Sequence, residues 1–184
     1  MKKCNTLSTG IMKKIYVLLL LSIITVYWGS CKKTTVAVVD FSKYTVTGNE
    51  CQITSEDSTD WTNDLIWTRQ DSSLVAFSDT FSFSDTSAGK ISISPACPNP
   101  SNGLFICTVT PQRQCKMKLV CVNTSYDILY YNTYLLNSEP ITLGFDFRNV
   151  TAFHKNTNYR MYYAFYSSLR DSMYYRGHGD FRIQ

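Results

Sequence analysis

ITLGFDF, from Ile141 to Phe147, is the stretch of sequence that decides the fold. Its apolar side chains alternate strictly with Thr142, Gly144 and Asp146. Because successive side chains of a β-strand point to opposite faces, this period of two predicts a strand with one buried and one exposed face. The segment therefore predicts a sheet whose apolar face packs against a second layer.

Similar patterns recur along the chain, and helical periodicity is nearly absent after Cys31. Short runs of β-branched and aromatic residues are separated by clusters of Gly, Pro, Asn, Asp and Ser, which favour turns. We expect strands over residues 36–39, 44–47, 65–68, 73–77, 91–94, 104–109, 118–122, 128–136, 141–147, 159–166, 172–176 and 181–183. This density predicts an all-β fold, an antiparallel, immunoglobulin-like β-sandwich, with a small β-barrel as the alternative.

One segment departs from the strand pattern. Residues 56–71 are the single place where we expect a helical turn, with Trp61, Leu65 and Trp67 directed inward.

The N-terminal region carries the features of a secretion signal. An apolar run over residues 15–26 follows two lysines and precedes the small residues Gly29 and Ser30. The run is shorter than the roughly 20 apolar residues that a membrane-spanning helix needs. We therefore predict a signal peptide over residues 1–30, and we expect translation to begin at Met12.

The cysteine that follows Gly29-Ser30 resembles the lipobox of bacterial lipoproteins, and the motif is similar to that of many Bacteroidota lipoproteins. The resemblance implies cleavage before Cys31 and acylation of its thiol, for example with palmitate. It predicts a lipidated tether over residues 31–40 and a sandwich domain over residues 41–184 held on a membrane, because acyl chains partition strongly into lipid. Lys32-Lys33 favours the outer membrane facing the periplasm, with the cell surface as the alternative; an ordinary secreted protein is the competing interpretation.

Charge and motif content narrow the function. Four of the 18 basic residues lie in the signal, which leaves 14 basic against 14 acidic residues. A balanced body lacks the concentrated positive charge on which nucleic-acid affinity depends. The sequence also contains no G-x-S-x-G, H-E-x-x-H or glycine-rich phosphate loop. We therefore expect no enzymatic activity, no cofactor and no nucleic-acid partner.

The two histidines and a group of aspartates are the remaining candidates for chemistry. His178 lies between Gly177 and Gly179, which predicts a tight turn, and we expect His154 to be a solvated loop residue. The aspartates at positions 57, 60 and 64 could form an oxygen cage for calcium, but their spacing is not that of an EF-hand and a polar loop is the favoured interpretation. We therefore predict no metal site.

The segment Pro98-Asn99-Pro100 is followed by Ser101-Asn102-Gly103 and predicts a stiff link into the strand at residues 104–109, because proline cannot donate to a sheet. The motif also resembles the opening of the C-terminal sorting domains of type IX secretion. The resemblance covers Pro98 to the end of the chain and implies an immunoglobulin-like sandwich. The resemblance implies an alternative function, in which the domain is a sorting module for type IX secretion.

Five cysteines follow Cys31, so they cannot all pair with one another. Cys107 and Cys121 lie in strand-like runs and are expected in the core. Cys97 and Cys115 lie in loop-like contexts and are the predicted disulfide, since an exported protein meets an oxidising compartment.

Tyrosines are concentrated late in the chain. Both faces of the strand expected at residues 159–166 are aromatic, so one set must face away from the core. We therefore predict a contact surface formed by Tyr162, Tyr166, Tyr174 and Tyr175, although tyrosine is also simply a good strand former. The predicted function is a structural or interaction module for a protein or glycan partner, with an undetected glycan-active enzyme as a further alternative.

Overall fold

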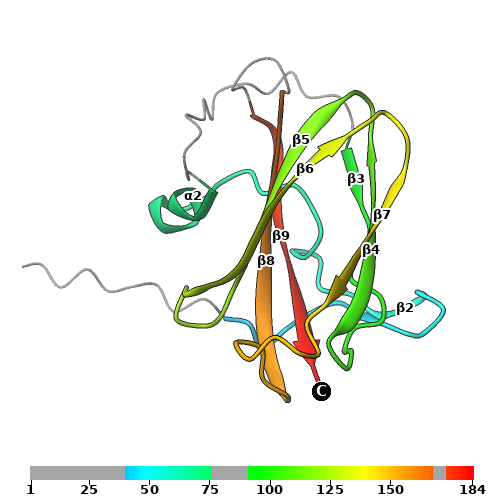
Figure 1. Ribbon diagram of the computed structural model, residues 1–184, viewed down its shortest axis with the longest axis vertical. Helices are drawn as coiled ribbons and strands as arrows, with labels where there is room; N and C mark the ends of the chain where they lie inside the picture. Colours follow the sequence, from blue (N-terminus) through cyan, green and yellow to red (C-terminus); the bar gives the residue numbers. More distant parts are fainter. Residues whose placement is uncertain (1–39, 76–90, 168–172) are drawn as a thin grey trace, which may run out of the picture. The chain divides into compact units, whose positions relative to one another are not determined.

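The computed structural model describes residues 40–75, 91–167 and 173–184, which belong to one compact unit (Figure 1). The predicted signal, Cys31 and the strand expected at residues 36–39 lie outside these residues. The elements are β1 (Val46–Thr47), β2 (Ile53–Ser55), α2 (Arg69–Val75), β3 (Ile91–Ile93), β4 (Leu104–Pro111), β5 (Cys115–Val122), β6 (Ile128–Leu136), β7 (Ile141–Asp146), β8 (Thr157–Ser167) and β9 (Met173–Ile183).

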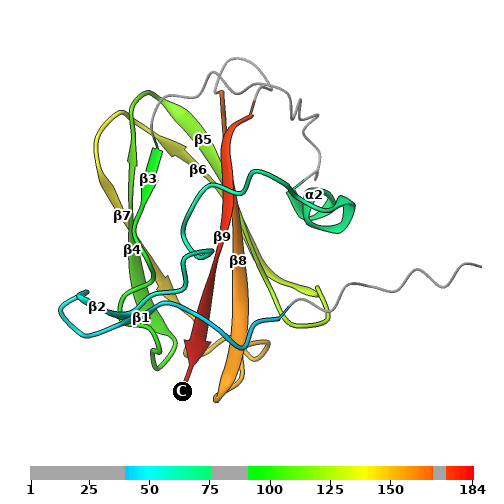
Figure 2. The ribbon, with the colours of Figure 1, turned by 180° about the vertical axis from the view of Figure 1, so that it is seen from behind.

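Two antiparallel sheets face each other and confirm the predicted sandwich. One sheet has the order β3-β4-β7 and the other the order β6-β5-β8-β9, while β1 and β2 form a separate hairpin (Figure 2). The sheets do not close into a barrel. The chain crosses from one sheet to the other after β4, after β6 and after β7, so β6 and β7 lie in different sheets although they follow one another in the sequence.

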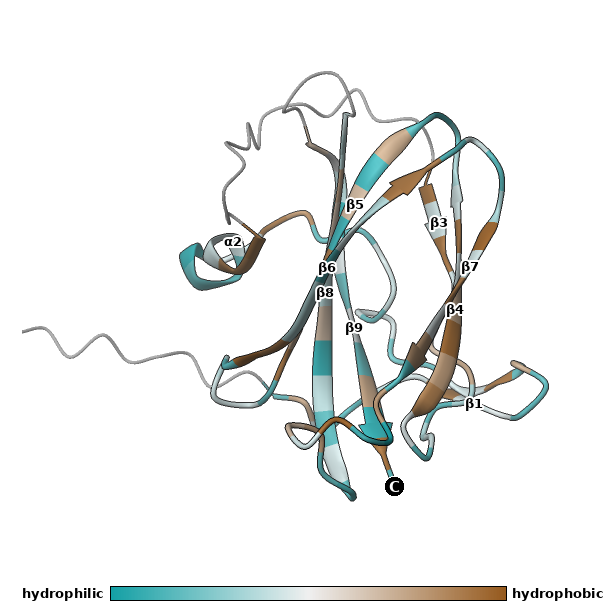
Figure 3. Ribbon diagram, in the orientation of Figure 1, coloured by the Kyte–Doolittle hydropathy of each residue, from teal (hydrophilic) through white to brown (hydrophobic). Residues whose placement is uncertain are grey.

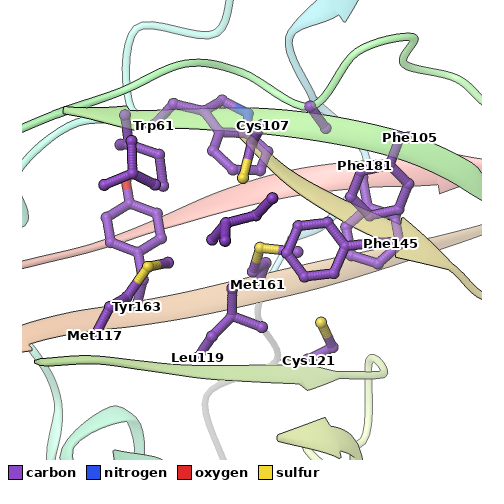
Figure 4. Packing of buried hydrophobic residues seen from close by; sticks show 14 of the residues in the cluster. Trp61, Phe105, Cys107, Met117, Leu119, Cys121, Phe145, Met161, Tyr163 and Phe181 are labelled. Carbon is purple, nitrogen blue, oxygen red and sulfur yellow. The ribbon is translucent and has the colours of Figure 1, made fainter. Parts of the chain in front are cut away.

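The main core lies between the two sheets and is built by strand alternation (Figure 4). Leu143, Phe145 and Phe147 are buried as their spacing predicts. Phe105 of β4 stacks on Phe145, with ring centroids 5.2 Å apart, and lies 4.8 Å from Phe181 of β9. Aromatic side chains from both sheets therefore supply much of the apolar area that stabilises the fold.

A second, smaller core covers the opposite face of the four-stranded sheet. α2 lies on this face in both views, on the side away from β4 (Figures 1 and 2), and the preceding Trp67 belongs to the same buried cluster. Thr68 and Asp71 explain where the helix begins: Thr68 Oγ1 accepts the Asp71 N–H at 3.1 Å, and Asp71 Oδ2 accepts the Thr68 N–H at 2.8 Å. This reciprocal pair is a capping box, which satisfies two donors at the helix N-terminus.

The region before β3 corrects several expectations. The helix occupies Arg69–Val75, so residues 73–75 are not the start of a strand, and residues 65–68 form no strand either. Trp61 and Trp67 are buried as predicted, but Leu65 is 85% exposed. The apolar residues in these two runs therefore predicted strands where the structure has a loop and a short helix. α2 packs only one short face against the sheet.

The predicted turn at Gly177, His178 and Gly179 is also wrong, because all three lie inside β9. The glycines are needed for packing. A Cβ atom at Gly179 would lie 2.3 Å from the ring of Trp61, and one at Gly177 would lie 2.0 Å from the carbonyl oxygen of Thr62. The absence of side chains lets the loop that contains Trp61 press against the backbone of the strand.

The structure corrects the predicted disulfide. Cys97 is bonded to Cys51, which lies in the turn between β1 and β2, and Cys115 is a buried free cysteine at the start of β5. Cys107 and Cys121 are buried in the main core as expected. The bond therefore ties the β1-β2 hairpin to the segment that enters β4.

Candidate functional site

The predicted tyrosine surface is not exposed. Tyr162 and Tyr166 do face away from the main core, but they are only 2% and 1% exposed, because the second core covers them. Tyr175 is partly buried and stacks on Tyr163. Tyr174 belongs to β9, and its side chain lies outside the described part of the structure. The expectation that these residues form a contact surface is therefore wrong for the first two.

Tyr162 instead holds α2 against the sheet. Its hydroxyl donates to Asp71 Oδ1 at 2.7 Å, and the hydroxyl of Tyr126 donates to the same oxygen at 3.1 Å. Burial opposes ionisation of Asp71, but its hydrogen bonds, first among them that from Thr68, leave its pKa lowered overall. An ionised carboxylate accepts several donors at once, so this cluster of hydrogen bonds holds α2 on the sheet.

His178 takes part in a second cluster of hydrogen bonds. Its Nδ1 lies 2.8 Å from Asp64 Oδ2, and the same carboxylate oxygen accepts the indole N–H of Trp67 at 2.7 Å. Arg176 donates to the carbonyl oxygens of Asp64 and Leu65 at 3.1 and 2.7 Å. These contacts fix the loop before α2 on the sheet.

A third polar cluster is the most deeply buried. Arg160 forms a two-pronged ion pair with Asp180, with N–O distances of 2.6 and 2.7 Å. Asp60 accepts the backbone N–H groups of Thr45 and Asp180 at 2.9 and 3.2 Å. Burial, together with the nearby charge of Asp180, raises the pKa of Asp60 from 3.8 to about 7, and burial also raises the pKa of Asp180 against the opposing effect of Arg160.

Asp60 makes stability depend on pH in an unusual direction. Because its pKa is higher in the folded state, the folded protein binds a proton more tightly than the unfolded chain between about pH 4 and pH 7. The melting temperature should therefore rise as pH falls from 8 to 5, as measured by thermal unfolding monitored by circular dichroism. Asp60→Asn should flatten this rise, whereas Asp57→Asn, which removes a carboxyl with a lowered pKa, should leave it in place. A wild-type melting temperature that falls steadily over this range would contradict the assignment.

The three aspartates considered for calcium have separate partners. The side-chain oxygens of Asp57 accept from Thr59, while Asp60 and Asp64 serve the two clusters described above. Within the described ranges no group of three or more His, Cys, Asp or Glu residues could hold a metal ion. His154 is exposed in the loop before β8.

One concavity lies at the surface of the described part of the chain. It has a volume of about 500 Å³ and is lined by residues at the start of the described chain and in the loops beside β8. Asn158 Nδ2 donates to the carbonyl oxygen of Phe41, and Arg182 Nη1 donates to Asn158 Oδ1 at 2.9 Å. The polar groups of Asn158 and Arg182 are thus engaged within the protein.

The edges of the four-stranded sheet differ sharply. Backbone and side-chain groups of the segments at 60–64 and 99–101 form hydrogen bonds with the backbone along the outer edge of β9. These bonds are Trp61 N–H to His178 O at 2.7 Å, Asp64 N–H to Arg176 O at 2.8 Å, Asp180 N–H to Asp60 Oδ1 at 3.2 Å, Asn99 Nδ2–H to Asp180 O at 3.0 Å, Arg182 N–H to Asn99 Oδ1 at 2.9 Å and Ser101 N–H to Arg182 O at 2.9 Å. The edge of β9 is therefore closed to a further strand.

β6 lies at the other edge, and among the described residues no strand pairs with its outer side. Ile128, Tyr131 and Leu135 are 40%, 66% and 62% exposed, and the arrowhead of β6 is coloured as hydrophobic in Figure 3. All nine residues of this strand are uncharged. We call Ile128, Tyr131, Thr133 and Leu135 with the outer backbone of β6 the β6 edge; it is the best candidate for a binding site.

Other exposed apolar side chains are more scattered. Leu65 and Ile66 project from the loop before α2, and Leu104 and Ile106 lie on the outer face of β4. Single exposed apolar residues are common on protein surfaces, whereas an uncovered strand edge also offers unpaired backbone groups.

No protein-family model matches the chain, and no curated protein matches it in sequence. Within the described part, no helix is long and apolar enough to cross a membrane.

Proposed function

We propose that the protein is a cell-envelope lipoprotein, anchored through acylated Cys31, whose sandwich domain is a non-enzymatic interaction module. The observation that carries the interaction role is the contrast between the two edges of one sheet: β9 is closed by hydrogen bonds, whereas β6 is apolar and no described strand pairs with its outer side. Natural sheets normally protect such edges, so an unprotected edge indicates a place for a partner. The lipobox-like sequence supports the anchor, with the outer membrane facing the periplasm as the proposed location.

The partner is proposed to be a protein rather than a glycan. A strand edge recognises another backbone, whereas glycan sites depend on exposed aromatic rings and polar groups in a concavity. Tyr162 and Tyr166 are buried, and Asn158 and Arg182 in the concavity bond to groups within the protein.

The alternative as a type IX sorting module has less support from the fold. Such a module would begin near Pro98, but β3 at Ile91–Ile93 is hydrogen-bonded to β4 in the same sheet. Cys51 and Cys97 also join the two sides of that boundary. Removal of the chain after Pro98 would therefore divide one sheet of the sandwich.

The anchor is tested with cells grown on labelled palmitate. Wild-type protein should carry the label and remain in the membrane fraction, and Cys31→Ala should lose both the label and the membrane association, because the acylated thiol is gone. Cys115→Ala, which removes a different free thiol and keeps Cys31, is the control and should change neither. An unlabelled wild-type protein would contradict the lipoprotein assignment.

The interaction role is tested with a photo-crosslinking residue in intact cells. Placed at Tyr131 on β6, it should give a discrete crosslinked product, and placed at Leu104, which is exposed on the other sheet, it should not. Equal products at both positions, or none at Tyr131, would contradict a role for the β6 edge.

A further inference from the structure

We propose that the β6 edge pairs with the same edge of a second copy of this chain, in an antiparallel arrangement about a two-fold axis at Thr133. This inference rests on the proposed role as an interaction module and names its partner. The two copies would join their four-stranded sheets into one continuous sheet through backbone hydrogen bonds.

β6 lacks the features that keep other edges from pairing. Natural edge strands are short, charged, interrupted by proline, bulged or covered. β3 has only three residues, β7 ends at an ion pair between Asp146 and Arg148, and β9 is closed by loops. β6 has nine residues without charge, proline or glycine, and its pairing with β5 is regular from Tyr130 to Leu136.

In a single copy, a backbone N–H group at the centre of β6 is bonded to a neighbouring side chain. The N–H of Thr133 donates to the side-chain Oδ1 of Asn132 at 2.8 Å. A flexible amide side chain on the surface is a replaceable partner, because a backbone carbonyl of a second strand can accept the same proton. Pairing at Thr133 therefore exchanges two such local bonds for two between the copies, at little cost in unsatisfied donors.

The side chains are self-complementary about Thr133. Tyr131 and Leu135 lie two residues to either side, so two-fold antiparallel pairing sets Tyr131 of each copy opposite Leu135 of the other. The exposed apolar areas of both residues would then be covered by one another. The two Thr133 side chains would face each other directly, and threonine pairs and aromatic–aliphatic pairs both stabilise neighbouring strands.

Charge also favours a second copy. No charged residue lies on the strand itself, so self-pairing sets no like charges opposite one another. The nearest cations in the sheet are Lys116 and Lys118 of β5, which pair with Leu135 and Thr133. Lys118 is buried and donates to the carbonyl oxygen of Val75 at 3.2 Å. The two β5 strands of a dimer would lie three strand spacings apart, about 14 Å. That separation exceeds the Debye length of about 8 Å at physiological salt, so repulsion between the partly exposed Lys116 side chains of the two copies is largely screened.

The pairing is tested with the full-length protein extracted from membranes in mild detergent. Directly paired residues have Cα atoms about 5.5 Å apart, which is within the range that a disulfide spans. Thr133→Cys should therefore form a covalent dimer on a non-reducing gel. Thr142→Cys, at an exposed position of β7 in the other sheet, should remain monomeric.

A second measurement uses two differently tagged copies made in the same cells. The wild-type copies should co-purify, and Thr133→Lys in both should reduce co-purification about tenfold, because two like charges would lie directly opposite. Thr142→Lys should have no such effect. A folded Thr133→Lys protein, verified by an unchanged melting temperature, that still co-purifies would overturn the two-fold pairing.

The outcomes separate this inference from the proposed function. Absence of the covalent dimer together with a Tyr131 crosslink to a different protein would overturn self-pairing and retain the interaction module. Absence of both would overturn the two together.

Discussion

Arg160→Met is expected to lower the free energy of unfolding by about 3–5 kcal/mol, because it leaves a buried carboxylate without its cation. The side chains of Arg160 and Asp180 are only 12% and 2% exposed. Asp60 hydrogen-bonds the Asp180 backbone in the same cluster, so the removal of Arg160 leaves two buried carboxyl groups close together. Urea unfolding should show a lower midpoint with an unchanged slope.

The chain contains a matched control for this experiment. Arg148 and Asp146 form an ion pair with the same shortest N–O distance, 2.6 Å, but their side chains are 48% and 46% exposed. Arg148→Met should leave the urea midpoint unchanged, because water already solvates both charges. Asp180→Leu added to Arg160→Met should recover much of the lost stability, since it removes the uncompensated charge. Equal losses at Arg160 and Arg148 would refute the role of burial.

Loss of the disulfide is the other large effect we expect. Cys51 and Cys97 are separated by 46 residues. Closing a loop of this length restricts the unfolded chain, so replacing both cysteines with alanine should lower the free energy of unfolding by about 4 kcal/mol on the chain-entropy estimate. Reducing agent should lower the free energy of unfolding of the wild-type protein by a similar amount, as measured by urea unfolding. It should leave the free energy of unfolding of the double variant unchanged.

Thiol labelling tests the connectivity directly. Alkylation of the denatured, unreduced protein followed by peptide mass analysis should label Cys107, Cys115 and Cys121 and leave Cys51 and Cys97 unlabelled until reduction. Labelled Cys51 together with unlabelled Cys115 would instead support the pairing that the sequence suggested.

Much of the sandwich could be predicted because its signals are local. The alternation in ITLGFDF places Leu143, Phe145 and Phe147 in the core and leaves Thr142 exposed, as the structure shows, but Ile141 at the start of the strand is 38% exposed. The aromatic strand at 159–166 is likewise part of β8. Side-chain alternation depends only on neighbouring residues, so a single sequence is enough to read it.

The errors arise where distant segments decide the outcome. The glycines beside His178 looked like a turn, but they make room for Trp61, which lies more than a hundred residues earlier in the chain. Disulfide connectivity also depends on which segments meet in space, and spacing along the chain does not determine it. Cys115 looked like a loop residue because the signal for β5 was strongest further along, at residues 118–122.

The candidate site was missed for the same reason. Tyr162 and Tyr166 were expected to be exposed, since nothing near them in the sequence shows that α2 and Trp67 cover them. The strand at 128–136 was predicted, but its place at the edge of a sheet was not. One signal was available: nine consecutive strand residues without a charge are uncommon at an edge, which natural proteins tend to protect.

The hydrogen bonds along β9 also limit how far association through this sheet can proceed. Fibres of stacked strands grow because every added chain presents a fresh edge to the next. Here the far side is sealed by the segments at 60–64 and 99–101, so a chain joined through β6 offers no second acceptor within that sheet. Under the proposed pairing, growth within this sheet would stop after one addition, so the chain would form a dimer and would not polymerise through this sheet.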